Sequence, residues 1–129
     1  MNYYFTATLK DITFDNAIKK ITSELKKEDF GILTEIDLKA TFHKKLDVDF
    51  YNYKILGACN APFAYKSLQT EDKIGTMLPC NIIVQEKEIG TIQISAVNPI
   101  ASMQAIQNDS LVPIAIEVRD KLKRVIENL

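Results

Sequence analysis

The fold of this chain is constrained most by two neighbouring segments that have the pattern of an antiparallel hairpin. Residues 78–86 and 89–97 are both rich in apolar residues, and a charged turn that includes Gly90 joins them. In the second segment Ile92, Ile94 and Ala96 recur at every second position, which places them on one face of a strand. The two segments therefore predict a pair of adjacent strands in a sheet.

The rest of the chain alternates between strand and helix patterns. Further strands are predicted at residues 2–9, 32–36 and 50–58, and within 32–36 the alternation places Ile32, Thr34 and Ile36 on one face. A helical stretch is also predicted from Pro99 to Ile106. Five helices are predicted in all, and each is preceded by a side chain suited to an N-cap: Thr13, Asp37, Asn60, Asn98 and Ser110.

The order of these elements indicates a fold class. No long linker rich in proline, glycine or serine interrupts the 129 residues, so residues 1–129 are expected to form a single domain. Strands and helices mix without a repeated βαβ unit. The pattern therefore predicts an α/β chain of the α+β type, folded as a two-layer sandwich.

Charge and hydropathy limit the partners. The 16 Lys and Arg against 17 Asp and Glu leave a net charge of −1, which does not favour binding to nucleic acid or to anionic lipid. Residues 1–6 lack the pattern of a secretory signal, and no apolar run approaches the ~18 residues of a membrane span. A cytoplasmic location is expected, with Cys59 and Cys80 as free thiols.

The candidate site rests on a thiol that immediately precedes an amide side chain at two places, Cys59-Asn60 and Cys80-Asn81. Cys59 would lie between a strand and a helix, where unpaired backbone N–H groups stabilise a thiolate. Cys59, Asn60, Cys80 and Asn81 are therefore predicted to bind a small molecule or a soft metal. The alternative is that both cysteines are small apolar fillers and that Asn60 is only a helix cap.

Other chemistry has weaker support in the sequence. A phosphate-binding loop, a C-x-x-C motif, an H-E-x-x-H motif and a nucleophile elbow are all absent. Glu35 and Asp37 would share a strand face and could serve as acid and base, although Asp37 already suits a cap. The single histidine, His43, has the pattern of a surface residue on an amphipathic helix. The catalytic residues and the cofactor stay unassigned.

Three segments that occur together in order carry a resemblance to a known family: Gly-Ile-Leu-Thr-Glu-Ile-Asp at 31–37, Ile-Leu-Gly-Ala-Cys-Asn-Ala-Pro at 55–62, and Leu-Pro-Cys-Asn at 78–81. Over essentially its full length the chain resembles the bacterial and archaeal domain of unknown function 302 family. The resemblance implies a mixed or antiparallel sheet with helices on one face, similar to the arrangement in TATA-binding protein. It implies no DNA binding, because a fold does not determine a function.

Three functional interpretations stay open. The first is a small binding module for a small molecule or soft metal near Cys59-Asn60 and Cys80-Asn81, which is favoured because element ends carry function more often than interiors do. The second is a homodimeric interaction protein without a small ligand. Its candidate interface residues are the aromatic side chains of Tyr3, Tyr4, Phe5, Tyr51 and Tyr53. The third is a thiol-dependent enzyme that uses Cys59, with Cys80 as a resolving thiol.

Overall fold

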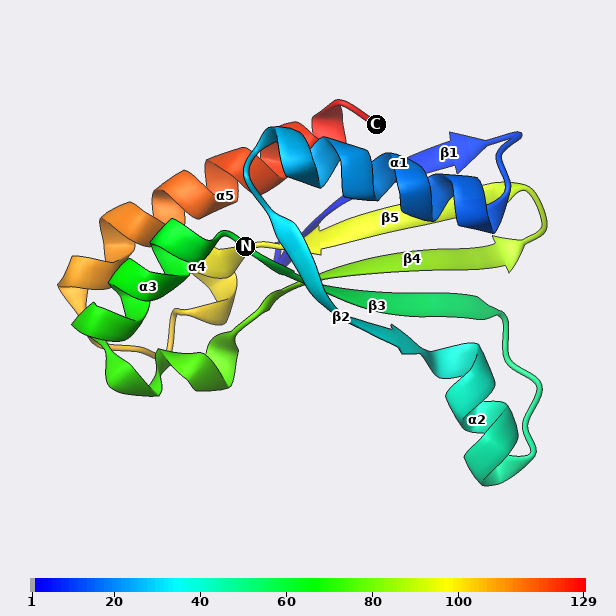
Figure 1. Cartoon of the computed structure of the whole chain (residues 1–129), viewed down its shortest axis with the longest axis horizontal. Coiled ribbons are helices and arrows are strands. Elements are labelled where there is room, and N and C mark those ends of the chain that lie inside the picture. The colour runs from blue at the N-terminus through cyan, green and yellow to red at the C-terminus, as the bar shows by residue number, and fades with distance from the viewer. Residues whose placement is uncertain (1) are drawn as a thin grey trace.

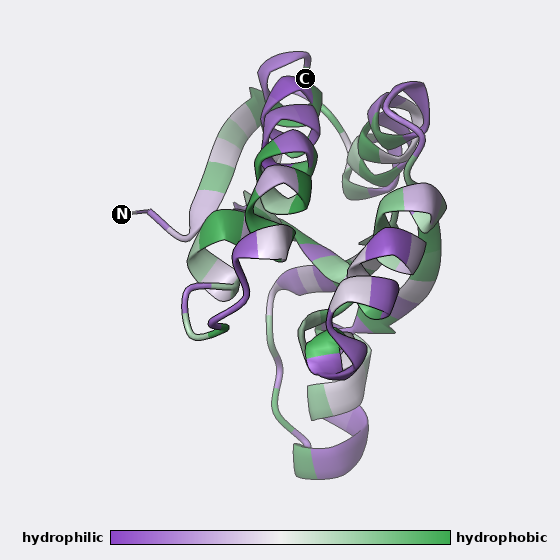
Figure 2. Ribbon diagram, turned by 90° about the vertical axis from the view of Figure 1, so that its left-hand side faces the viewer, coloured by the Kyte–Doolittle hydropathy of each residue, from purple (hydrophilic) through white to green (hydrophobic). Residues whose placement is uncertain are grey.

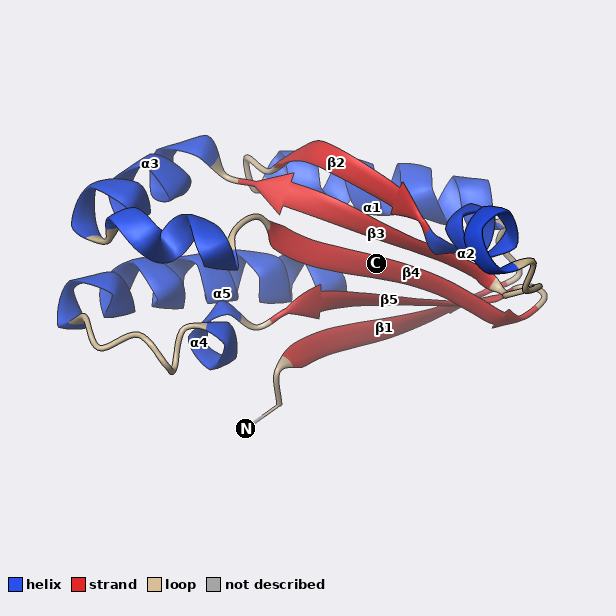
Figure 3. Ribbon diagram, turned by 90° about the horizontal axis from the view of Figure 1, so that it is seen from below, coloured by secondary structure: helices blue, strands red, loops and turns tan. Residues whose placement is uncertain are grey.

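A computed structural model describes residues 2–129, and Met1 lies outside the described residues. Its strands form one antiparallel five-stranded sheet in the order β1-β5-β4-β3-β2, which is seen edge to edge in Figure 3. The predicted hairpin is confirmed as β4 and β5, and the other predicted strands are confirmed to within two residues. The strands are β1 (Tyr4–Lys10), β2 (Gly31–Asp37), β3 (Asn52–Cys59), β4 (Cys80–Glu88) and β5 (Thr91–Val97).

The helices complete a two-layer α+β fold, as predicted. Helices α1 and α5 lie side by side over one face of the sheet, α3 and α4 lie beyond one end of it, and α2 projects from the opposite end (Figure 1). On the opposite face of the sheet, α2 lies only at the end where β2 finishes and β3 begins (Figure 3), and the rest of this face, which no helix covers in residues 2–129, is called the open face below. The helices are α1 (Phe14–Lys27), α2 (Leu38–Leu46), α3 (Ala61–Thr70), α4 (Pro99–Ser102) and α5 (Val112–Glu127), with 3-10 turns η1 (Asp72–Met77) and η2 (Asp109–Leu111).

The core lies between the sheet and the helix pair. Apolar and polar residues alternate along the strands, as the colours of β1 show in Figure 2, so one face of the sheet is apolar and packs against α1 and α5. The fully buried side chains include Leu56 of β3, Ile94 of β5 and Leu122 of α5. No helix among residues 2–129 has the length and apolar character that crossing a membrane requires.

Two predictions about the ends of the last two helices are wrong. Thr13, Asp37 and Asn98 accept cap hydrogen bonds as predicted, but Ser110 does not cap the last helix. Its own backbone N–H donates to Asn108 Oδ1, so Asn108 caps η2 and α5 begins only at Val112. The stretch from Pro99 is also shorter than predicted and ends at Ser102, because the chain turns away to reach Asn108, whose amide donates to the Thr70 carbonyl.

A bulge in β2 overturns one further expectation. Ile32 pairs with Ala58 whereas Thr34 pairs with Gly57, so Leu33 is an extra residue in the strand. The extra residue reverses the alternation, and Ile32 therefore packs against the core while Thr34 and Ile36 lie on the other face. The prediction that all three share one face is wrong.

Candidate small-molecule pocket

The ends of β3 and β4 bring the two cysteines together at one end of the sheet. Ala58 pairs with Cys80, so Cys59, the next residue of β3, lies beside Cys80. Both cysteines line a cavity of about 290 Å³ between the end of the sheet and the helices α3 and α5. We call this cavity the thiol pocket. Its helical walls are apolar: Phe63, Ala64 and Leu68 from α3, and Ile114 and Val118 from α5.

Asn60 is held in the wall of the thiol pocket by a contact that the sequence does not predict. It occupies the N-cap position of α3, but its side chain makes no cap hydrogen bond, so its predicted capping role is wrong. Its Nδ2 instead donates to the Glu28 carbonyl at 3.2 Å, and the Glu28 carboxylate accepts from Arg124 Nη2 at 2.9 Å. The amide nitrogen is therefore held in place, and no group among residues 2–129 is seen to donate a hydrogen bond to its Oδ1.

The other polar wall group of the thiol pocket is already satisfied. Ser67 Oγ donates to the Phe63 carbonyl at 2.8 Å, within α3. In residues 2–129 every fully buried side-chain nitrogen and oxygen has a partner. Asn60 is the remaining polar side chain of the wall, so the pocket offers an entering molecule mainly van der Waals contact.

Burial determines the charge state of Cys80. It raises the pKa of this thiol from 9.0 to about 11, and the neighbouring Cys59 adds to the rise. Cys80 is therefore a neutral thiol at neutral pH and behaves as a small apolar wall group. This charge state does not suit Cys80 as an attacking or resolving thiolate, since the thiolate is the reactive form.

The raised pKa of Cys80 predicts a loss of stability in alkaline solution. Between pH 9 and pH 11 the unfolded chain has released this proton but the folded chain still holds it, so the unfolding free energy falls as the pH rises. We expect the stability of the native protein relative to a Cys80→Ala variant to fall by about 2–3 kcal/mol across this range. Urea unfolding of both proteins at pH 8 and pH 11 measures the change, and an unchanged difference would contradict it.

Asn81 does not join the other three predicted site residues. It pairs with Gly57 and is exposed on the open face, because successive side chains of a strand point to opposite faces. There it lines a hollow of about 460 Å³ together with Tyr3, Tyr4 and Tyr53. The structure therefore brings together Cys59, Asn60 and Cys80, and separates Asn81 from them by the thickness of the sheet.

The aromatic residues predicted to form an interface do not lie on one common surface. Tyr3 and Tyr4 are 69% and 42% exposed, and their rings contact each other edge to face at 4.9 Å. Phe5 instead packs against the core, on the helix side of the sheet. Tyr51 stacks on Phe50 with ring centroids 4.1 Å apart.

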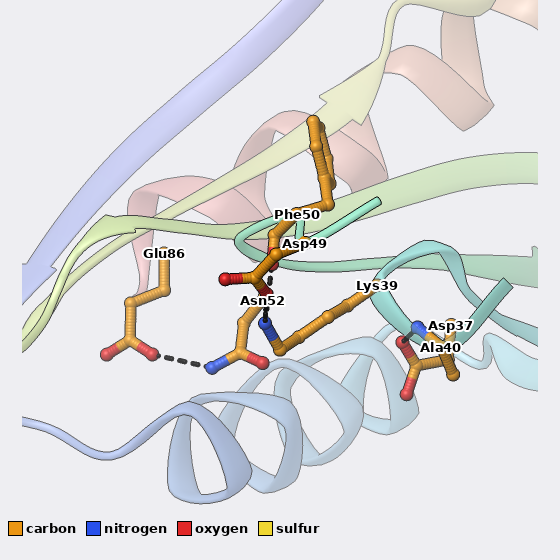
Figure 4. Close-up of polar contacts among 7 residues, drawn as sticks. All are labelled: Asp37, Lys39, Ala40, Asp49, Phe50, Asn52 and Glu86. Atoms are coloured by element: carbon orange, nitrogen blue, oxygen red, sulfur yellow. Dashed lines mark hydrogen bonds and ion pairs between the residues drawn. The ribbon is translucent and has the colours of Figure 1, made fainter. Parts of the chain in front are cut away.

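The remaining candidates lie at the opposite end of the sheet, near α2, and are engaged in structural contacts. Glu35 accepts from Lys54 at 2.6 Å, and this hydrogen bond raises the pKa of Lys54. Asp37 accepts the backbone N–H of Ala40, as Figure 4 shows. The exposed His43 belongs to α2, which projects from the end of the sheet opposite α3 (Figure 1), and it does not line the thiol pocket.

Figure 4 also shows how the segment after α2 is attached. Lys39 Nζ donates to the Phe50 carbonyl and to Asp49, and Asn52 Nδ2 donates to Glu86 at 2.9 Å. The two contacts of Lys39 fasten the segment between α2 and β3, and the hydrogen bond of Asn52 joins β3 to β4. None of these side chains lines the thiol pocket. Within the described part of the chain, three or more His, Cys, Asp or Glu side chains nowhere gather closely enough to hold a metal ion.

Several wall residues of the thiol pocket were not predicted as site residues. Phe63, Leu68, Ile114 and Val118 have helical apolar spacing, which indicates burial and does not distinguish a filled core from a cavity. Met103 lies after the short helix α4, where the sequence predicts a continuing helix. Only the packing of α3 against α5 identifies these residues as pocket walls.

Comparisons with known proteins agree with the geometry of the fold. A family model described as "Domain of unknown function DUF302" matches residues 5–129. A crystal structure of an uncharacterized conserved DUF302 protein from Bacillus stearothermophilus is similar, with a TM-score of 0.88 and 24% identity over 98% of each chain. None of the curated proteins matches the chain.

Proposed function

The chain belongs to the DUF302 family, and we propose that it is a binding module for a small, mainly apolar molecule held in the thiol pocket. The observation that carries the proposal is an apolar cavity at the point where the Cys59-Asn60 and Pro79-Cys80 segments meet α3 and α5. Ligand pockets in proteins have volumes of roughly 300–1,000 Å³ and are lined mostly by apolar groups. At about 290 Å³ the thiol pocket is of the size that suits a small ligand.

Asn60 supports a more specific description of the ligand. A rigidly held amide oxygen in an otherwise apolar wall rewards a ligand that places one hydrogen-bond donor against it. A carboxylate at the same place could not bond to the amide oxygen, because both groups are hydrogen-bond acceptors. It would lose its hydration in the pocket without gaining a hydrogen bond in return. The preferred ligand is therefore neutral at this end and carries a hydroxyl or N–H group.

The thiols support a small organic molecule more than a soft metal. A zinc site needs three or four protein ligands, and the two cysteines have no third His, Cys, Asp or Glu side chain close enough to complete one in residues 2–129. Cys80 is also protonated at neutral pH. A thiol enzyme that uses Cys59 stays a prediction, and a bound apolar molecule near Cys59 is compatible with it.

A fluorescence titration with N-phenyl-1-naphthylamine tests the proposal. This probe is apolar and neutral, carries one N–H group, and becomes fluorescent when it leaves water. We expect saturable binding of one probe per chain with a dissociation constant in the micromolar range, about −8 kcal/mol. A signal that rises linearly with probe concentration, without saturation, would contradict the proposal.

A second candidate function is self-association through the open face. The exposed rings of Tyr3 and Tyr4 favour it, since aromatic side chains are enriched in interfaces, and a net charge of −1 gives little repulsion between two copies. We expect a concentration-dependent dimer in sedimentation equilibrium, with a dissociation constant raised at least roughly tenfold by Tyr4→Lys. Tyr65→Lys on α3 is the matched control, and a native protein that stays monomeric would rule this function out.

A further inference from the structure

We infer that the ligand of this module is a linear aliphatic molecule that extends beyond the thiol pocket, past the side chain of Met103, into a second cavity. The inference rests on the proposed binding function and adds the shape of the ligand to it. It follows from the way in which two cavities share a wall.

The second cavity lies next to the thiol pocket, on the side of α4 and η2. It has a volume of about 210 Å³, and most of its lining is apolar, with Ile100, Ile106 and Leu111 among the wall residues. Met103 and Ala115 line both cavities. These two side chains therefore form the partition between the cavities.

Whether the partition is open or closed depends on Met103, because its side chain can change conformation and that of Ala115 cannot. Ala115 is 4% exposed and belongs to α5, so its position is fixed by the helix. Met103 is half-buried and follows the last residue of α4. Methionine is unbranched and has three rotatable bonds, so a change of rotamer at this one residue can join the two cavities.

The joined space selects for the shape of the ligand. It is longer than either cavity alone, because Asn60 lines only the first cavity and Ile106 lines only the second. A compact ring system fills only the first cavity, whereas an unbranched chain can follow both. A hydroxyl group at one end of the chain can donate to Asn60 Oδ1 while its methylene groups reach the partition and pass it.

Chain length provides the measurement, because each methylene group that leaves water increases the affinity by roughly fourfold. The experiment is the displacement of N-phenyl-1-naphthylamine by unbranched 1-alkanols of increasing length. In the native protein we expect the affinity to keep rising with chain length until the second cavity is filled. Beyond that length, added methylene groups stay in water and the affinity levels off.

Substitutions at the partition should change the length at which the affinity levels off. In Met103→Phe the larger, stiffer side chain closes the partition, so the affinity should level off at least two carbons earlier than in the native protein. In Met103→Ala the partition is open, so the longest chains should bind at least as tightly as they do to the native protein. Met77→Ala, which removes a partly exposed methionine outside both cavities, is the matched control and should leave the profile unchanged.

The outcomes separate this inference from the proposed function. If the native protein binds the probe but the affinity for alkanols levels off at the same length in the native protein and Met103→Phe, the second cavity is not used and the inference is wrong. The same conclusion follows if the probe binds and no alkanol displaces it. If neither the probe nor any alkanol binds, the proposed function fails together with the inference.

Discussion

An Ala64→Phe variant is expected to bind N-phenyl-1-naphthylamine at least roughly tenfold more weakly than the native protein, a loss of about 1.4 kcal/mol. Ala64 is half-buried on α3 and lines the thiol pocket. A phenyl ring at this position would occupy space that the probe needs. Because the site lies at the rim of the core and not inside it, the larger side chain has room to enter the cavity without displacing the sheet. Fluorescence titration of the two proteins measures the difference.

Ala61→Phe provides a matched control on the same helix. Ala61 is the first residue of α3, is exposed, and does not line the thiol pocket. This variant adds the same ring to the surface and should bind the probe as the native protein does. Equal affinity in all three proteins would mean that the probe binds elsewhere. Thermal unfolding of each protein confirms that the chain stays folded.

Among the substitutions, the largest effect on stability at neutral pH is expected from Gly57→Ala, which should lower the unfolding free energy by about 1–3 kcal/mol. A Cβ atom at Gly57 would lie 2.2 Å from Thr34 Oγ1 and 2.7 Å from Pro79 Cγ. Both distances are far below van der Waals contact, so Thr34 on β2 and Pro79 before β4 would both have to move away from Gly57 on β3. Urea unfolding measures the loss, and a variant as stable as the native protein would contradict the packing described here.

Two further variants show whether this loss comes from the close approach. Gly31→Ala is the control in β2, since a Cβ atom there meets nothing within 4 Å, and its stability should change by no more than about 0.5 kcal/mol. Thr34→Ala removes the hydroxyl that blocks the Gly57 Cβ atom. The double variant Thr34→Ala, Gly57→Ala should therefore lose less stability than the sum of the two single variants.

The regular parts of the fold could be predicted because their signals are local. The alternation of Ile92, Ile94 and Ala96 depends on neighbouring residues alone, and it places them on the buried face of β5 as the structure has them. The caps Thr13 and Asp37 likewise satisfy backbone groups within the next turn of the chain. Such features need no knowledge of distant partners.

The features that were predicted wrongly depend on partners distant in the sequence. The bulge at Leu33 adds one residue without changing the composition of β2, and only the pairing with Ala58 and Gly57 reveals it. Asn60 looks like a cap, but its Nδ2 donates to the distant Glu28 carbonyl, and its side chain makes no cap hydrogen bond. Asn108, tied to the Thr70 carbonyl, displaces Ser110 as a cap in the same way.

The candidate site was predictable only in part, for the same reason. The segments Cys59-Asn60 and Cys80-Asn81 lie on strands that prove to be neighbours, so their convergence required knowledge of the strand order. The separation of Asn81 from Cys80 follows from strand geometry once the strand is placed. The cavity itself leaves no mark in the sequence, because it arises from the space that α3 and α5 do not fill.

The central claim is that the thiol pocket is the ligand site, and an NMR titration of the native protein with N-phenyl-1-naphthylamine tests it most directly. The backbone amide signals of Ala64, Leu68 and Cys80 report on the pocket, and those of Gln93 and Ser95 report on the open face. We predict saturable chemical-shift changes at the first three residues and none at the other two. Shifts confined to Gln93 and Ser95, or no shifts at saturating probe, would contradict the account.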